Sequence, residues 1–233
     1  MSVFAIGDLH LSLGGDKPMD VFPGWQDYVA RLEQNWRALI SPGDTVILAG
    51  DTSWAMTLGA TLADFQFIHS LPGEKYLIKG NHDYWWNSRA KMDAYLEANG
   101  LTSLHILHNS AVQAEGMALC GTRGWLFEKG EAHDQKILAR EAARLQMSID
   151  AARDMQGERV VFLHYPPVYA DETSEEIVAV LKKNGIRRCY YGHIHSTGCA
   201  YALNGNYEGI EFRLISSDFL RFSPIKIQQI VEF

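Results

Sequence analysis

The chain has 233 residues, of which 47% are hydrophobic and 21% are charged, and its formal net charge is −7 at pH 7. This composition is typical of a globular protein, and the length fits a single domain spanning residues 1–233. The acidic balance argues against a general binder of nucleic-acid polymers or anionic membranes, which would carry a basic surface. No stretch approaches about 18 apolar residues, so we expect no membrane span.

The first residues and the cysteines indicate a cytoplasmic protein. Residues 1–12 contain no basic segment, and Asp8 interrupts their apolar run, which indicates a first strand and not a signal peptide. The three cysteines, Cys120, Cys189 and Cys199, form no C-x-x-C pair. An odd number without such pairs does not predict a disulfide scaffold, and a reducing cytoplasm is the simplest location.

Short apolar runs recur along the chain, and five of them end in polar residues. In chain order these ends are Asp8 and His10, then Asp51, then Asn81, His82 and Asp83, then His164, and finally His193 and His195. Brief β-branched and aromatic runs bounded by Gly or Pro predict buried strands. Residues 104–107 and 117–125 predict two more strands.

Helical patterns alternate with these strands. Residues 25–40 predict a helix whose apolar face carries Trp25, Val29, Leu32, Trp36 and Leu39. Further helices are expected over residues 88–98, about 134–155 and 173–184, and the last of these begins with a predicted capping box from Thr173 to Glu176.

The C-terminal part has a different pattern. Residues 201–216 predict a hairpin with a turn at Asn204-Gly205, and residues 225–233 predict a last strand. Residues 12–24 form a long connection rich in Gly and Pro directly after His10. We expect this connection to be a surface loop, with a loop over a site as the alternative.

The polar residues at the strand ends are expected to meet at one site. In open α/β sheets, ligands bind where the carboxyl ends of strands emerge. Carboxylate, amide and imidazole donors suit divalent ions such as Mn, Fe, Zn or Ni, and thiolates of a structural zinc site are missing from the set. Seven candidate ligands, with His82 set aside, are too many for one tetrahedral ion and fit two metals that share a bridging carboxylate.

Two local patterns support this site. Asp8 and His10, like His193 and His195, are two residues apart, so their side chains lie on one side of an extended segment. A glycine precedes Asp8, Asp51, Asn81 and His193. Glycine permits a positive φ and a close approach of the backbone to the site.

The order GDLH, GD, GNHD, a lone His before Pro, and GHIH resembles the calcineurin-like metallophosphoesterases over residues 7–195. The resemblance implies an α/β fold, a four-layer α/β/β/α sandwich with two mixed β-sheets flanked by helices. It implies two divalent metal ions. The implied ligands are Asp8, His10 and His195 for one metal, Asn81, His164 and His193 for the other, and Asp51 as the bridge. His82 would be the catalytic histidine, and Asp83 would orient or tune it.

The chain departs from the protein Ser/Thr phosphatase branch of these enzymes. No Asp-Arg-Gly follows Asp51, and the third motif is GNHD instead of GNHE. The pattern is more similar to the bacterial-type branch of small phosphohydrolases. The resemblance therefore implies a metal-dependent phosphoric ester hydrolase that acts on phosphomonoester or phosphodiester bonds of a small molecule, nucleotides included, through attack of a metal-bridging hydroxide.

The charges at the site favour this reading. Two divalent ions with the carboxylates of Asp8 and Asp51 leave a net charge of about +2, which attracts a phosphate ester. Two alternatives remain, a non-catalytic scaffold that keeps the fold and a nuclease that acts on short oligonucleotides. A scaffold need not keep all the ligands and the catalytic histidine, whereas here every position is filled.

Other residues near the motifs have two possible roles. Arg123 could bind the substrate phosphate through its planar guanidinium, or could form an ion pair after a strand. Six aromatic residues could stack on a substrate base or could pack in the core: Trp54, Tyr84, Trp85, Trp86, Trp125 and Phe127.

Overall fold

Two mixed β-sheets form the centre of the protein in the computed structural model, which describes residues 1–126 and 135–228. In spatial order the first sheet contains β13 (Ile225–Ile227), β1 (Val3–Ile6), β2 (Thr45–Leu48), β3 (Glu74–Leu77) and β4 (Leu104–Ile106). Strands β1 to β4 are parallel, and β13 pairs with β1 in the antiparallel direction.

The second sheet contains β11 (Gly205–Tyr207), β12 (Ile210–Leu214), β10 (Arg188–Tyr191), β7 (Glu158–Leu163), β6 (Met117–Thr122) and β5 (Ala111–Ala114), in spatial order. Strands β12, β10, β7 and β6 are parallel, and the two edge strands are antiparallel to their neighbours.

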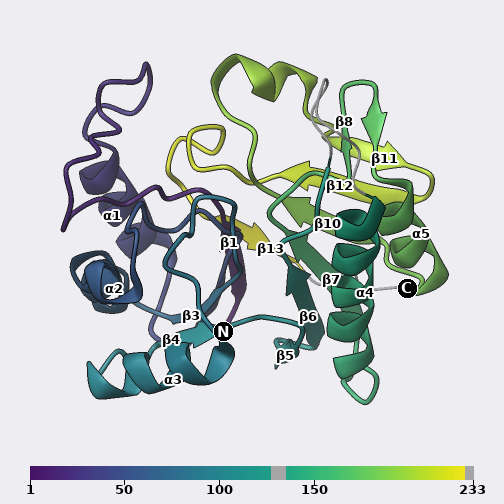
Figure 1. Ribbon diagram of the computed structural model, residues 1–233, viewed down its shortest axis with the longest axis horizontal. Coiled ribbons are helices and arrows are strands. Elements are labelled where there is room, and N and C mark those ends of the chain that lie inside the picture. Colours follow the sequence, from purple (N-terminus) through teal and green to yellow (C-terminus); the bar gives the residue numbers. More distant parts are fainter. Residues whose placement is uncertain (127–134, 229–233) are drawn as a thin grey trace.

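Helices cover the outer face of each sheet (Figure 1). Helices α1 (Tyr28–Leu39), α2 (Leu62–Ser70) and α3 (Arg89–Ala98) lie on one side, and α4 (Gln135–Ala151) and α5 (Glu175–Lys183) lie on the other. This arrangement confirms the predicted four-layer α/β/β/α sandwich. No helix in the described ranges combines the length and the hydropathy needed to cross a membrane.

The alternation of side chains along each strand builds three apolar layers. In β1, Phe4 and Ile6 pack toward the helices α1 to α3, while Val3 and Ala5 pack between the sheets. In β7, Val161 and Leu163 pack toward α4 and α5, while Val160 and Phe162 face the first sheet. Because successive side chains of a strand point to opposite faces, a continuous apolar run is what a strand buried on both faces requires.

Three local predictions were wrong. Leu39 is 46% exposed, because the chain leaves the helix at Ile40, which takes the buried position instead. The predicted capping box at Thr173 does not form, because Thr173 pairs with Val168 in a short hairpin and Ser174 occupies the N-cap position.

The turn of the C-terminal hairpin was also misplaced. The turn lies at Glu208 and Gly209, which both have positive φ, and Gly205 is already the first residue of β11. Two successive residues with positive φ are what a two-residue hairpin turn of the favoured twist requires. Asn204 instead accepts a hydrogen bond from the Leu214 N–H at the other end of the hairpin.

Several elements were not predicted, among them α2 and β5. Strands β8 (Val168–Tyr169) and β9 (Glu172–Thr173) form a separate two-stranded hairpin between β7 and α5. A short helix, η2 (Ser196–Tyr201), directly follows His195, and a second short helix, η1 (Leu58–Thr61), leads into α2. The β8–β9 hairpin and η2 lie beside the site described next.

Candidate metal centre

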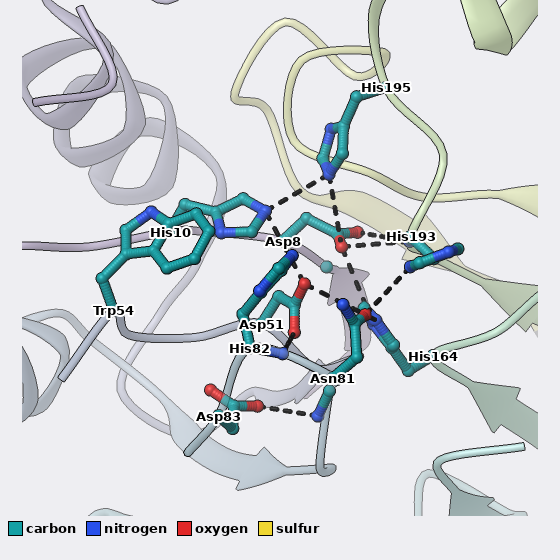
Figure 2. A network of polar contacts seen from close by, with 12 residues as sticks. Asp8, His10, Asp51, Trp54, Asn81, His82, Asp83, His164, His193 and His195 are labelled. Atoms are coloured by element: carbon teal, nitrogen blue, oxygen red, sulfur yellow. Dashed lines mark hydrogen bonds and ion pairs between the residues drawn. The ribbon is translucent and has the colours of Figure 1, made fainter. Parts of the chain in front are cut away.

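The polar residues that follow β1, β2, β3, β7 and β10 converge between the two sheets (Figure 2). They meet because the carboxyl ends of parallel strands lie at the same edge of a sheet. In both sheets this edge borders the site. The residues are Asp8, His10, Asp51, Asn81, His82, His164, His193 and His195. Four of these side chains are buried, those of Asp8, His10, Asp51 and His164, and the other four are partly buried. The carboxylates of Asp8 and Asp51 are 0% and 2% exposed.

Asp8, His10 and His195 form one group of potential ligands. One nitrogen or oxygen atom of each lies within 4.8 Å of the others. The Nε2 atoms of His10 and His195 are 3.3 Å apart, and His195 Nε2 is 3.6 Å from Asp8 Oδ1.

Asp51, His164 and His193 form a second group with the same spacing. The side-chain oxygen of Asn81 lies between the two imidazoles, 2.5 Å from His164 Nε2 and 3.0 Å from His193 Nδ1. Asn81 therefore adds a fourth potential ligand that carries no charge.

Asp51 lies between the two groups. Its Oδ2 atom is 3.8 Å from His10 Nε2 and 3.6 Å from His164 Nε2. Its Oδ1 atom accepts a hydrogen bond from the His82 backbone N–H at 2.8 Å, which holds the carboxylate in this position. One carboxylate within reach of both groups is the arrangement that a bridging ligand needs.

The hydrogen bonds of His164 test whether this donor set fits a cation. Its Nδ1 atom is 3.1 Å from the Ala49 carbonyl, so Nδ1 carries the proton in the neutral ring. Burial lowers the pKa of His164 and of His193 to about 3, so both rings are neutral. The Nε2 lone pair of His164 then faces the oxygen of Asn81. A bound cation satisfies both lone pairs.

The carboxylates also indicate that the donor set fits cations. Burial, and then the neighbouring Asp83 and Asp8, raise the pKa of Asp51 well above its ordinary value. Burial also lowers the pKa of His10 well below its ordinary value, so this imidazole does not supply the missing positive charge. Buried carboxylates beside the neutral imidazoles of His10, His164 and His193 gain from divalent cations, and the residues present fit two of them.

A residue outside the sequence motifs, Asp218, orients the ring of His195. Asp218 Oδ1 is 2.9 Å from His195 Nδ1, and Asp218 Oδ2 accepts a hydrogen bond from the Ser196 N–H. Burial lowers the pKa of His195, but its hydrogen bonds to Asp218 and Asp8 outweigh burial and raise the pKa to about 10. Metal binding must therefore displace a proton from Nε2.

Asp218 could have been found from the sequence by one signal. It lies four residues beyond β12, in the run Ser216-Ser217-Asp218, and β12 is parallel to β10 with Leu214 opposite Tyr191. It is thus a sixth polar strand end. The sequence pattern predicted an antiparallel hairpin of the segments that form β11 and β12. That pattern does not indicate the direction of β12 relative to β10.

We expect Asp218→Asn to weaken metal binding by about 10- to 100-fold, because an aspartate on the remote nitrogen of a histidine ligand fixes its tautomer and raises its basicity. The measurement is a competition between the protein and a chelator of known affinity. Asp150→Asn is the matched control, because Asp150 is an exposed carboxylate on α4 that pairs only with residues of the surface. Equal metal affinity in all three proteins would contradict this role of Asp218.

The backbone at the strand ends is unusual in two ways. Asp8, Asp51 and His193 themselves have positive φ, a conformation that residues other than glycine rarely adopt. Two glycines of the strand ends serve close approach, since a Cβ at Gly80, before Asn81, would collide with the Asp51 side chain and one at Gly192, before His193, with the Asp8 side chain. This local strain is typical of a functional site.

His82 lies beside the two groups of ligands, and none of its ring atoms belongs to them. Burial, followed by the charge of Lys17, lowers the pKa of His82. The sequence predicts that Asp83 orients or tunes this ring, and the hydrogen bonds of its carboxylate show the route by which it could do so. The Asp83 carboxylate accepts hydrogen bonds from the N–H groups of Thr52, Ser53 and Gly80 and from Trp85 Nε1. Asp83 therefore fixes the loop that carries His82, and acts on the ring only through that loop.

Trp54 packs against two histidines of the site. Its ring is stacked on His10 at 4.8 Å and lies 4.4 Å from His82. On the solvent side, Lys17 Nζ lies 4.5 Å over the same Trp54 ring. Residues 12–24 thus do extend to the site, as the alternative reading of this loop expected.

The remaining aromatic residues differ in their exposure. Trp85 is fully buried and packs on Phe65, whereas Tyr84 is 54% exposed and its hydroxyl is 3.5 Å from His82 Nδ1. Phe127 lies outside the described residues. Arg123 pairs with the buried Glu141 at 3.3 Å and lies over the Trp125 ring, so its guanidinium already has protein partners.

Comparison with solved structures identifies the same architecture in other proteins. A protein of unknown function from Aquifex aeolicus aligns with a TM-score of 0.52 and 16% identity, over 97% of this chain and 95% of that one. The phosphopantetheinyl hydrolase of Mycobacterium tuberculosis aligns with a TM-score of 0.52 and 15% identity, over 97% and 95% of the two chains. A protein of Thermus thermophilus aligns with a TM-score of 0.53 and 12% identity, over 83% and 81%. At these identities the likeness shows the fold alone.

Sequence comparison gives the family directly. No curated protein matches the chain significantly. The family profile of the calcineurin-like phosphoesterases matches residues 1–197, a range that includes the strand-end residues from Asp8 to His195 but not Asp218. The resemblance inferred from the motifs is thereby confirmed, and the chain belongs to the calcineurin-like phosphoesterase family.

Proposed function

We propose that the protein is a phosphoesterase with two divalent metal ions that hydrolyses a phosphomonoester or phosphodiester bond of a small molecule. The observation that carries the proposal is the pair of ligand groups that share Asp51, with His82 beside both and outside either. The ligands would be Asp8, His10, Asp51 and His195 for one ion, and Asp51, Asn81, His164 and His193 for the other. The ions are of the Mn, Fe, Zn or Ni type.

The metals, when bound, would activate water and neutralise charge on the phosphoryl oxygens. The protein residues supply the charge balance, the proton transfer and the positioning at the site. Asp51 supplies one negative charge to the ligand set, and Asn81 supplies a neutral oxygen. The centre therefore keeps a net positive charge, which attracts an anionic ester. His82, in the fraction of the protein in which its ring is protonated, donates a proton to the departing alkoxide oxygen, and Asp83 keeps the loop of His82 in place. Trp54 limits the position of the His82 ring.

A small-molecule ester is favoured over a nucleic-acid polymer by the acidic chain, which carries a net charge of −7. The fold neighbour from Mycobacterium tuberculosis is named a phosphopantetheinyl hydrolase, so a phosphopantetheine ester belongs among the compounds to test. We place the activity in the cytoplasm, because Cys120, Cys189 and Cys199 are free thiols.

The test is a reconstitution of the metal-free protein with Mn, Fe, Zn, Ni or Mg, each assayed on phosphomonoesters, cyclic nucleotides and phosphodiesters. We expect activity to rise with bound metal up to two ions per chain and to disappear with a chelator. A protein that holds two ions per chain and hydrolyses none of these esters would be a scaffold, and the proposal would be wrong.

A further inference from the structure

A cavity of about 660 Å³ opens beside the candidate metal centre. His193 and His195 belong both to its wall and to the two ligand groups, so the cavity borders the candidate metal centre. The opposite part of the wall is the β8–β9 hairpin, and we call the cavity the hairpin pocket. A volume of this size is far more than a phosphate needs and is typical of a pocket for an organic molecule.

The walls of the hairpin pocket are held in place by contacts between the hairpin and η2. Tyr169 donates a hydrogen bond from its hydroxyl to the Gly198 carbonyl at 3.4 Å, and its backbone forms a β-bridge with Ala202. On the metal side, the Tyr165 ring lies 4.3 Å from the His193 ring. The pocket is therefore formed before a ligand arrives, and binding does not have to order it.

The lining is apolar near the metal centre and acidic at the hairpin. Tyr165, Tyr169 and Ile194 supply aromatic and aliphatic surface. Asp171 and Glu172 supply two carboxylates, and neither has an ion pair with any residue in the described ranges. No lysine or arginine belongs to the described lining.

This distribution of charge limits the substrate. A second phosphate or a carboxylate on the organic part would meet Asp171 and Glu172, which no lysine or arginine of the described lining balances, and repulsion of that kind costs affinity. An amine on the organic part would be attracted to the same carboxylates. The ester phosphate itself would stay at the metal centre.

We propose that the hairpin pocket receives the organic part of the substrate, and that it selects a phosphoester with a single phosphoryl group on an aromatic or aliphatic arm that carries an amine. This inference rests on the proposed function and specifies its substrate class. It assigns Asp171 and Glu172 as the residues that determine specificity, and Tyr169 as an apolar contact of the arm.

The experiment uses the metal-loaded protein and three benzyl phosphates with a para-aminomethyl, para-methyl or para-carboxylate group. The reacting ester is the same in all three compounds, so differences report recognition of the arm. We expect kcat/KM to decrease in the order cationic, neutral, anionic, with at least about a tenfold span between the first and the last. Binding of the three corresponding benzylphosphonates, measured by calorimetry, should show the same order.

Asp171→Asn combined with Glu172→Gln should reduce that span to about twofold or less, because the charges that discriminate are removed. Glu175→Gln combined with Glu176→Gln is the matched control. It removes the same charge from the start of α5, where neither residue lines the hairpin pocket, and it should keep the full span.

The outcomes separate the two proposals. If the protein hydrolyses the esters but ranks the anionic compound equal to or above the cationic one, the assignment of the hairpin pocket is wrong while the phosphoesterase function stands. The same holds if the double variant at Asp171 and Glu172 keeps the full span. If no ester of any kind is hydrolysed and no phosphonate binds, both proposals are wrong.

Discussion

His82→Ala is expected to lower kcat by about 10²- to 10⁴-fold on an alkyl phosphate ester, which is the usual contribution of a positioned proton donor. The loss should be smaller on an activated aryl phosphate, because a good leaving group needs no proton. Metal content should stay at two ions per chain, because the His82 ring belongs to neither ligand group. Turnover and metal content are measured on the same reconstituted samples.

His105→Ala is the control for His82→Ala. His105 is a partly exposed histidine of β4 that pairs with Glu74 in the first sheet, so its removal should leave turnover unchanged. Full kcat of metal-loaded His82→Ala on both the alkyl and the aryl ester would show that His82 does not transfer the proton.

Asp51→Asn is expected to reduce bound metal below two ions per chain and to lower turnover by on the order of a thousandfold, since a two-metal centre contributes several kcal/mol of transition-state stabilisation. The physical reason is the position of Asp51, whose Oδ2 atom lies within 3.8 Å of a ligand atom in each group. Elemental analysis of dialysed protein gives the number of ions, and steady-state kinetics gives the turnover.

Thermal melting separates the loss of a ligand from misfolding in Asp51→Asn. Burial and two neighbouring carboxylates raise the pKa of Asp51, so its ionised form destabilises the metal-free protein above that pKa. The metal-free variant should therefore melt at or above the temperature of the metal-free wild type, while added metal should stabilise the wild type more.

Asp44→Asn is a useful comparison for Asp51→Asn, because Asp44 is also a buried aspartate but accepts hydrogen bonds from Ser2 and Ser41 far from the metal centre. It should keep two ions per chain. Two tightly bound ions in Asp51→Asn would mean that another residue bridges the groups.

Much of the fold could be predicted from the sequence, because central strands such as β1, β2 and β7 are buried on both faces and contain continuous apolar runs. The run of β7 and the polar residue that follows it, His164, are adjacent in the chain. A pattern contained within eight or nine residues does not depend on distant contacts. Helix ends and turns were less predictable, as Ile40 and Thr173 show, because a neighbouring segment decides which residue leaves the helix first.

The partners of each polar side chain could not be predicted in the same way. Asp83 follows His82 directly, yet its carboxylate binds the backbone of Thr52 and Ser53 some thirty residues away. Asp218 contacts His195 only because β12 lies parallel to β10. Such contacts depend on how strands are arranged in the sheet, which no local pattern specifies.

The sequence by itself determined which residues form the candidate metal centre, since eight polar residues at five strand ends, together with the match of residues 1–197 to the family, identify the set. Only the tertiary structure decided the distances between these residues within the two groups, that Asp218 supports His195, and that an acidic hairpin borders the pocket beside them. The reason is physical. The capacity to bind a metal is a property of each side chain. The distances between side chains and the electric field at a site depend instead on segments that lie far apart in the sequence.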